Sequence, residues 1–390
     1  MDNKAVTDKK KNEYIELLRF VLCMMIFFHH SGHVTGGAVS LLPACGFAAD
    51  VFYMITGYYA IRHICSRMGK IRATESAADP ADTEITRRPL LYSVRYTLRK
   101  ILRVYPYVVF GTVIIYILEF IVDNRLNTTV TAADRLMRLK DMLIELTFLP
   151  LTGAIGDLNA YNYRNAPMWY LSAMLIALPL VMYLCIRLGK VFRYVIVFVI
   201  PLALQILMMQ LFGGVLPWSQ FAGIINSGYI RAFSSLLMGG GIYVLSEYIK
   251  AEYSSYLTQS EGEDKQIDIV RFIATVAEVM LILAFLFFVA VGIKGYAQVA
   301  FLYVIAAMLT LTLSGLSYSS ELRLRPAGFL GRLSLPIYCI HWGIYRWMAA
   351  FFGYLDYKVA IAVTLILCLA AAVAMMTVID MINKRGRVNA

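Results

Sequence analysis

Long apolar segments alternate along the chain with shorter polar connections. We predict a membrane-spanning helix for each apolar segment, because each is long enough to cross a hydrocarbon core of about 30 Å. The first segment holds an arginine and runs directly into the second, so it is not expected to be a cleaved signal peptide. The ten predicted spans lie near residues 14–34, 44–64, 101–122, 167–187, 192–212, 227–249, 270–292, 296–316, 330–352 and 359–382.

The composition excludes a soluble globular protein. The chain is 60% hydrophobic and only 16% charged, and its mean hydropathy is +0.66. We therefore expect an all-α integral membrane protein with about ten transmembrane helices in one bundle. Residues 1–390 are expected to form a single polytopic domain with no fused soluble domain. Its polar parts are a cytoplasmic tail at 1–13, a cytoplasmic loop at 65–98 and an extracytoplasmic loop at 123–166.

The net charge of +11 follows the membrane topology. With the N-terminus inside, 26 Lys and Arg residues fall on the inner side and seven on the outer side. This asymmetry predicts a multi-pass protein of the cell membrane with both termini in the cytoplasm. Nucleic acid is accordingly not an expected partner, whereas the lipid bilayer is.

Several common chemical motifs are missing from the sequence. The six cysteines lie in or beside predicted spans without metal-ligand spacing, so we expect them to be reduced and structural, and we expect no metal site. No Walker loop, dinucleotide fingerprint or G-x-S-x-G motif is present. The glycine-rich run MGGGI (238–242) lies within a span, where it favours close packing between helices.

One stripe of the first span carries both a cation and imidazoles. Arg19 and His30 are eleven residues apart, which brings them to within about 20° of one helix face. His33 shares that face, whereas His29 is about 100° away from it. Charged residues at membrane depth are costly and usually face a protein interior or a cavity, so we predict that Arg19 and His30 are catalytic. A satisfied interhelical hydrogen bond is the alternative, and we favour it for His29.

Asp50 lies in the outer half of the second span and is the expected partner of His30. A short loop joins the first two spans, so the two residues should lie at similar depth. A carboxylate beside an imidazole raises its basicity and fixes its tautomer, as a general base requires. The alternative is a purely structural carboxylate near a helix end.

Two further groups of charged residues suggest binding. Arg231 and Arg346 lie toward the outer side, where each would pair with a carboxylate such as Glu119 or face a cavity. At the start of the third span, a basic cluster is either a membrane anchor or a binding site for the phosphates of a cofactor. That cluster consists of Arg99, Lys100 and Arg103.

The outer loop contains an amphipathic stretch at 133–146 and an aromatic, amide-rich run at 157–165. Tyr161 and Tyr163 offer flat faces beside amide groups, which suits a polar ring with hydroxyls. The alternative is that they belong to the aromatic belt that is expected at a membrane surface.

The chain resembles the acyltransferase-3 family of bacterial integral membrane enzymes, which acylate cell-surface glycans and related acceptors. Arg19 and His30 match the family's hallmark, an arginine and a histidine separated by ten residues. Four further stretches resemble family motifs in the family's order: GFAADVFYMITGYYA (46–60), RKILRVYP (99–106), MWYLSAML (168–175) and GRLSLPIYCIH (331–341).

The resemblance implies residue roles. Asp50 holds the acidic position of the second motif, and Lys100 and Arg103 hold the two basic places of the third. The candidates for the acceptor site or the cavity are Trp169, Tyr338, His341, His33, Arg231, Tyr161 and Tyr163. Met174 stands where many family members have a glutamate, so a glutamate there is not part of this mechanism.

The resemblance implies an O-acyltransferase that moves an acyl group, expected to be acetyl, from cytoplasmic acyl-CoA to a hydroxyl of a cell-surface glycan or related acceptor. Arg99, Lys100 and Arg103 would then bind the donor. A transporter or flippase of a polar or glycan-linked substrate is the second hypothesis, although the two halves of the chain lack detectable symmetry. A sensor or scaffold is the third, and it leaves Arg19 and His30 unexplained.

Overall fold

The computed structural model describes residues 13–34, 41–74, 80–125, 131–148, 164–223, 225–259, 264–322 and 324–388. Helices make up nearly all of this part of the chain, with one short antiparallel hairpin between α7 and α8. The helices are α1 (Glu13–His29), α2 (Phe47–Thr74), α3 (Pro80–Arg87), α4 (Pro89–Arg125), α5 (Ala132–Glu145), α6 (Trp169–Leu188), α7 (Val197–Phe212), α8 (Ser227–Gln259), α9 (Asp264–Val291), α10 (Ala297–Ser314), α11 (Ala327–Phe352) and α12 (Tyr357–Val388). Shorter elements are the 3₁₀ turns η1 (His30–His33), η4 (Ala166–Met168) and η6 (Tyr318–Glu321), the π-helical turn η5 (Phe192–Ile196) and the strands β1 (Phe221–Ala222) and β2 (Ile225–Asn226).

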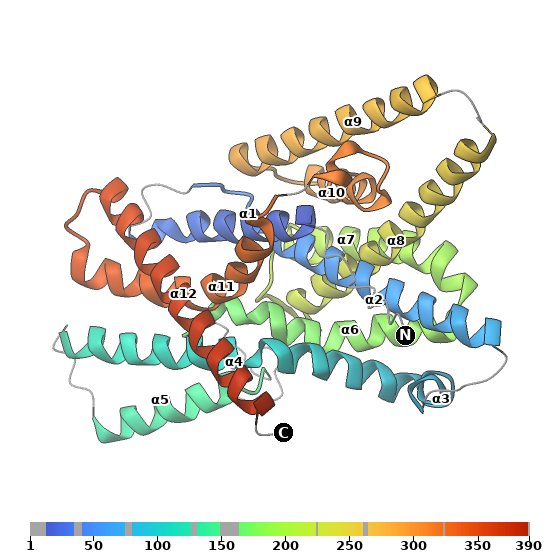
Figure 1. The fold of residues 1–390 in the computed structure, drawn as a ribbon. Coiled ribbons are helices and arrows are strands. Elements are labelled where there is room, and N and C mark those ends of the chain that lie inside the picture. Colours follow the sequence, from blue (N-terminus) through green and yellow to red (C-terminus); the bar gives the residue numbers. More distant parts are fainter. Residues whose placement is uncertain are drawn as a thin grey trace.

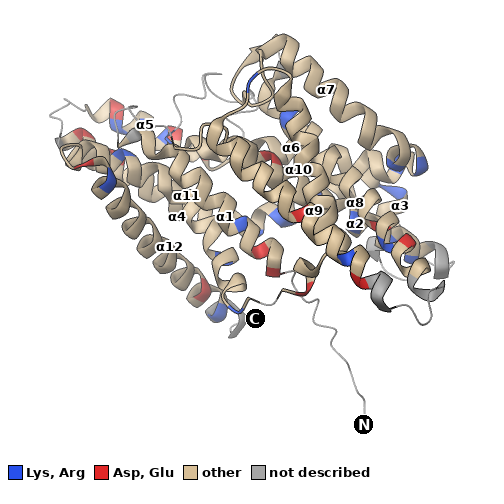
Figure 2. Ribbon diagram, turned by 90° about the horizontal axis from the view of Figure 1, so that it is seen from above, with Lys and Arg blue, Asp and Glu red and all other residues tan. Residues whose placement is uncertain are grey.

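Seven helical segments within the described ranges are long and apolar enough to cross a membrane. They contain α1, α4, α6, α7, α9, α10 and α12, and they confirm the prediction of an all-α membrane protein. Figure 2 shows long stretches of α7 and α12 without charged residues. Each crosses the apolar layer with its backbone hydrogen bonds closed inside the helix, as lipid requires.

The predicted spans at 44–64, 227–249 and 330–352 are also helical, as α2, α8 and α11. These helices contain buried polar residues, among them Asp50, Arg231 and His341. The most extensive helix pairings are α2 with α8, and α11 with α1 and α4. The more polar helices therefore lie at the centre, while α9 and α5 run along opposite edges of the bundle (Figure 1).

Glycines bring α2 and α8 into backbone contact. A Cβ atom added at Gly57 would lie 2.2 Å from the carbonyl oxygen of Leu236, and one added at Gly239 would lie 2.2 Å from that of Met54. Since no real Cβ atom tolerates such distances, only glycine fits at either position. This contact supports the packing role predicted for MGGGI (238–242).

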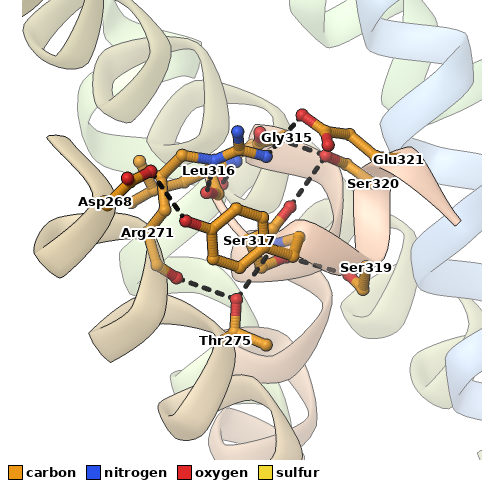
Figure 3. A network of polar contacts seen from close by, with 11 residues as sticks. Asp268, Arg271, Thr275, Gly315, Leu316, Ser317, Ser319, Ser320 and Glu321 are labelled. Atoms are coloured by element: carbon orange, nitrogen blue, oxygen red, sulfur yellow. Dashed lines mark hydrogen bonds and ion pairs between the residues drawn. The ribbon is translucent and has the colours of Figure 1, made fainter. Parts of the chain in front are cut away.

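A polar network fastens the edge helix α9 to the connection between α10 and α11 (Figure 3). The Arg271 guanidinium donates to Glu321 at 2.6 Å and lies 4.2 Å from the ring centroid of Tyr318. Deeper in the bundle, the Glu278 carboxylate accepts hydrogen bonds from Thr312 at 2.5 Å and from Ser319 at 2.6 Å. These bonds hold a helix whose remaining surface is mostly exposed.

We predict that Gly239→Ala destabilises the bundle, because the new methyl group must push α2 and α8 apart. Overpacking a core of this kind costs about 1–3 kcal/mol. Thermal unfolding of the purified protein in detergent should show a lower Tm. Gly69→Ala on α2 is the matched control, since no atom lies within 4 Å of its added Cβ. An equal loss of Tm in both variants would contradict the close contact.

Candidate functional site

A large cavity enters the bundle among α1, α2, α4, α6, α8, α10 and α11. Its volume is about 1050 Å³, which is at the upper end of the range for ligand sites, roughly 300–1,000 Å³. The acidic residue in its wall is Glu16. The basic residues in its wall are Arg19, Arg62, Arg67, Lys70, Lys100 and Lys250.

The cavity has a charged end and an apolar end. Arg67 and Lys70 lie near the C-terminal end of α2, and Lys250 lies in the C-terminal half of α8. The opposite end of the cavity is formed by Tyr170 and Met174 from the first turns of α6, together with other apolar side chains. A ligand with an anionic head and a slender, less polar arm would match this distribution.

The structure corrects the predicted basic cluster. Lys100 lines the cavity, whereas Arg99 and Arg103 are exposed and do not line it. Arg99 and Arg103 lie within about 40° of each other on the helix, and Lys100 lies about 100° from Arg99 toward the cavity. The sequence placed Arg62, Arg67, Lys70 and Lys250 only within the positive-inside pattern. The spacing of Arg62, Arg67 and Lys70 on α2 was the available signal for a binding surface.

Arg19 and His30 occupy different parts of the site. Arg19 lines the cavity and lies 3.4 Å from Glu16, with its side chain 37% exposed. The α-helix ends at His29, and His30 begins the 3₁₀ turn η1 beyond the lining of the cavity. The two residues predicted to share one face of the first span are thus separated: Arg19 lies in the cavity wall, and His30 lies in the turn that follows α1.

His30 pairs with His341 across the interface of α1 and α11. His30 Nδ1 lies 3.0 Å from His341 Nε2, and the centroid of the Trp342 ring lies 5.0 Å from that of His30. His341 Nδ1 lies 2.9 Å from the carbonyl oxygen of Tyr338, which can only accept, so Nδ1 carries the proton. Nε2 of neutral His341 must then accept from His30 Nδ1–H.

This hydrogen-bond chain assigns the tautomer of His30. With its proton on Nδ1, neutral His30 has an unprotonated Nε2, which is the form that a general base needs. His341 is 1% exposed and fixes both the tautomer and the orientation of the His30 ring. The sequence had placed His341 only among the candidates for the acceptor site or cavity.

Asp50 does not serve His30 as expected. Its carboxylate accepts from Arg231 at 3.0 and 2.7 Å and from Ser235 at 2.9 Å. Arg231 also donates to the backbone oxygens of Leu216 and Gly46. Both charged side chains are buried: Arg231 is 3% exposed and Asp50 is 1% exposed. The carboxylate that was expected to assist the His30 imidazole is therefore paired with an arginine from α8, which is distant in the sequence.

Trp169 and Arg231 belong to this ion-pair cluster and not to the wall of the cavity. The Arg231 guanidinium lies 5.3 Å from the ring centroid of Trp169, and Trp169 stacks on Trp218 at 5.5 Å. The cation and the two indoles therefore pack beside the buried carboxylate. The motif that supplied Trp169 contributes Tyr170 and Met174 to the cavity instead.

Tyr338 links the cavity to the histidine pair. It lines the cavity, and its ring centroid lies 5.9 Å from that of His341. Its hydroxyl donates to the carbonyl oxygen of Pro167, which holds the ring across the gap between α11 and α6. Tyr338 therefore adjoins both the cavity and His341.

Arg346 and His29 both make the structural contacts that were considered as alternatives for them. Arg346 pairs with Glu119 at 2.8 Å, as one of the alternatives expected, and Arg164 approaches the same carboxylate at 3.1 Å. His29 Nδ1 lies 3.0 Å from the Leu42 carbonyl oxygen, a structural contact. The side chain of His33 and residues Tyr161 and Tyr163 lie outside the described part of the chain.

The described ranges hold no group of three or more His, Cys, Asp or Glu side chains placed to bind a metal ion.

The described helices thus form a membrane bundle with a basic cavity and a hydrogen-bonded histidine pair. The model of the acyltransferase-3 family, described as an acyltransferase domain, matches residues 12–379. The chain therefore belongs to the acyltransferase-3 family and is a membrane acyltransferase. No curated protein and no solved structure matches it significantly.

We predict that Asp50→Asn strongly destabilises the protein, because it leaves the Arg231 guanidinium buried without a counter-charge. Removing one partner of a buried pair costs about 3–5 kcal/mol. The amount of folded protein extracted from membranes and its Tm should both fall. Asp380→Asn is the control, since its pair with Arg332 is exposed at 43% and 47%. Similar losses in both variants would contradict a structural role specific to Asp50.

Proposed function

We propose that this acyltransferase moves an acyl group, expected to be acetyl, from cytoplasmic acyl-CoA to a hydroxyl of a cell-surface glycan or related acceptor. The observation that carries the proposal is the cavity, with a basic opening at one end and Tyr338 beside His341 at the other. Acyl-CoA has the matching shape: a phosphate-rich nucleotide joined to a slender pantetheine arm.

In this proposal the nucleotide phosphates lie among Arg62, Lys70 and Lys100 at the opening of the cavity. Arg and Lys are the usual partners of phosphate groups. The pantetheine arm follows the wall past Arg19 toward Tyr170 and Tyr338. Its thioester then comes to the boundary between the cavity and the histidine pair.

The proposed membrane orientation agrees with this direction of transfer. With both termini in the cytoplasm and α2, α8 and α11 as the remaining spans, the basic opening faces the cytoplasm, where acyl-CoA is made. The Lys and Arg distribution, 26 inside and seven outside, supports this orientation. The acceptor approaches from the outer side, where Tyr161 and Tyr163 remain candidates for its recognition.

His30 acts as the general base. Its Nε2 takes the proton of the acceptor hydroxyl, the oxygen attacks the thioester carbonyl, and the C–S bond breaks as the new C–O bond forms. The CoA thiolate leaves and takes the proton from the imidazolium. His341 acts through His30 as a positioning residue. An acyl-histidine intermediate on His30 is the alternative course, and both routes need the same tautomer.

A transporter or flippase is the rival function. Asp50, Glu119 and Arg231 are all engaged in ion pairs, whereas a proton-coupled carrier needs groups that change partners during its cycle. The two functions differ in one product, since only a transferase releases CoA thiol from acyl-CoA.

We predict that His30→Ala lowers acyl transfer by about 10²–10⁴-fold, the usual loss on removing a general base. The measurement is thiol release from acetyl-CoA by purified protein in liposomes, with the amount of folded protein matched to wild type. His29→Ala should have a much smaller effect, because His29 binds the Leu42 backbone. Equal loss in both variants would argue against the tautomer assigned to His30.

We also predict that Lys100→Ala raises the KM for acyl-CoA more than it changes kcat. A hydrogen bond to a charged group is worth about 1.5–3 kcal/mol, and a loss confined to donor binding appears in KM. Arg99→Ala is the matched control, since Arg99 is exposed outside the cavity. If Arg99→Ala had the larger effect on KM, the donor would bind elsewhere.

A further inference from the structure

Helix α5 has an amphipathic pattern that is turned outward. Leu136, Leu139 and Leu143 lie within about 60° of one another on the helix, and they are 69%, 49% and 56% exposed. Helix α5 is not among the candidate membrane spans. An apolar face of this size on a helix in water would be an aggregation hazard.

Two charged residues of α5, Arg138 and Glu145, turn toward the bundle, whereas Asp134, Arg135 and Lys140 are exposed. Arg138 pairs with Asp123 of α4. Glu145, which is 6% exposed, accepts hydrogen bonds from the backbone N–H groups of Arg164 at 2.5 Å and Asn165 at 3.4 Å. A surface helix of a soluble protein normally buries its leucines, whereas the three leucines of α5 are exposed.

Helix α5 also runs back along α4 (Figure 1). Asn165, which binds Glu145 at the end of α5, donates to Thr112 of α4 at 3.1 Å. Thr112 lies thirteen residues before the end of α4 at Arg125, which corresponds to about 20 Å along the helix. It falls within the uncharged run 104–118, which must lie in the hydrocarbon core.

The exposed face of α5 continues the lipid-facing surface of α4. On α4, Ile117, Phe120 and Ile121 are 53%, 39% and 41% exposed within a candidate membrane span. The guanidinium of Arg135 on α5 lies 5.4 Å from the ring centroid of Phe120, so the two helices adjoin there. One apolar surface therefore covers parts of both helices.

We propose that α5 is a re-entrant helix embedded in the leaflet at the C-terminal end of α4, with Leu136, Leu139 and Leu143 in contact with lipid acyl chains. Lys140 shares the exposed face, and its long stem lets the ammonium reach the headgroups. Part of the segment 123–166 then lies inside the membrane and is not an aqueous loop throughout. The proposal does not depend on the identity of the donor or the acceptor.

This placement has a consequence for the polar groups beneath α5. Glu119 is shared by Arg164 and Arg346, and Glu145 binds the backbone at Arg164. With α5 in the leaflet, its inner face separates these groups from lipid. The charged cluster is thereby kept in a protein environment at the end of the bundle opposite to the basic opening of the cavity.

The test measures the surroundings of a fluorescent label at Leu139→Cys, in a Cys65→Ser background, because the other native cysteines are buried. The protein is reconstituted in phosphatidylcholine vesicles and labelled with an NBD reagent. Lipids with a nitroxide on the acyl chain report lipid contact, and iodide on both sides of the membrane reports water contact. Ile117→Cys on α4 is the lipid-facing control, and Lys294→Cys in the exposed α9–α10 connection is the aqueous control.

The proposal predicts that the label at residue 139 is quenched by nitroxide lipid as strongly as at residue 117, and by iodide several-fold less than at residue 294. Quenching by iodide to the level of residue 294, without quenching by lipid, would overturn it. So would a disulfide between two copies through Leu139→Cys, which would show that a second chain covers the face. Leu136→Cys repeats the measurement if the first variant does not fold.

Discussion

The buried ion pair between Asp50 and Arg231 is the interaction on which the rest of the bundle depends. A charge in an apolar interior is tolerated only when a partner and further hydrogen bonds satisfy it. Here the pair joins α2 to α8 about two helical turns from the point where Gly57 and Gly239 bring the two backbones into contact. The close approach favours the ion pair, since a wider separation of the helices would leave both charges unsatisfied.

The same ion pair determines which groups are left for chemistry. Because Asp50 is fully engaged, the hydrogen-bond partner of His30 comes from α11, where His341 is held by backbone carbonyls. The described wall of the cavity contains one acidic residue, Glu16, and several arginines and lysines. The cavity therefore carries an excess of positive charge. The proposed function places a polyanionic donor at the basic opening of the cavity and the His30 imidazole beyond the opposite end.

The sequence predicted the features that depend on local pattern. It did not predict the contacts between helices that are far apart in the sequence. The apolar segments correctly predicted helices, and two residues of the family motifs, Arg19 and Lys100, line the cavity. Spacing within one span could not show that Asp50 binds an arginine 181 residues away. Nor could it show that Arg99 turns away from the cavity that its neighbour lines, because that depends on how the helix is rotated in the bundle.

The central claim is that the cavity guides the acyl group of acyl-CoA to the histidine pair. Photolabelling with an acyl-CoA that carries a diazirine on its acyl chain tests it most directly, with the labelled positions mapped by mass spectrometry. The account predicts labelling at the end of the cavity opposite to its basic opening, at residues 170–174 and at Tyr338. Excess CoA should suppress this labelling. Labelling that CoA does not suppress would contradict the account. So would labelling confined to the exposed face of α4 around Arg99, outside the cavity.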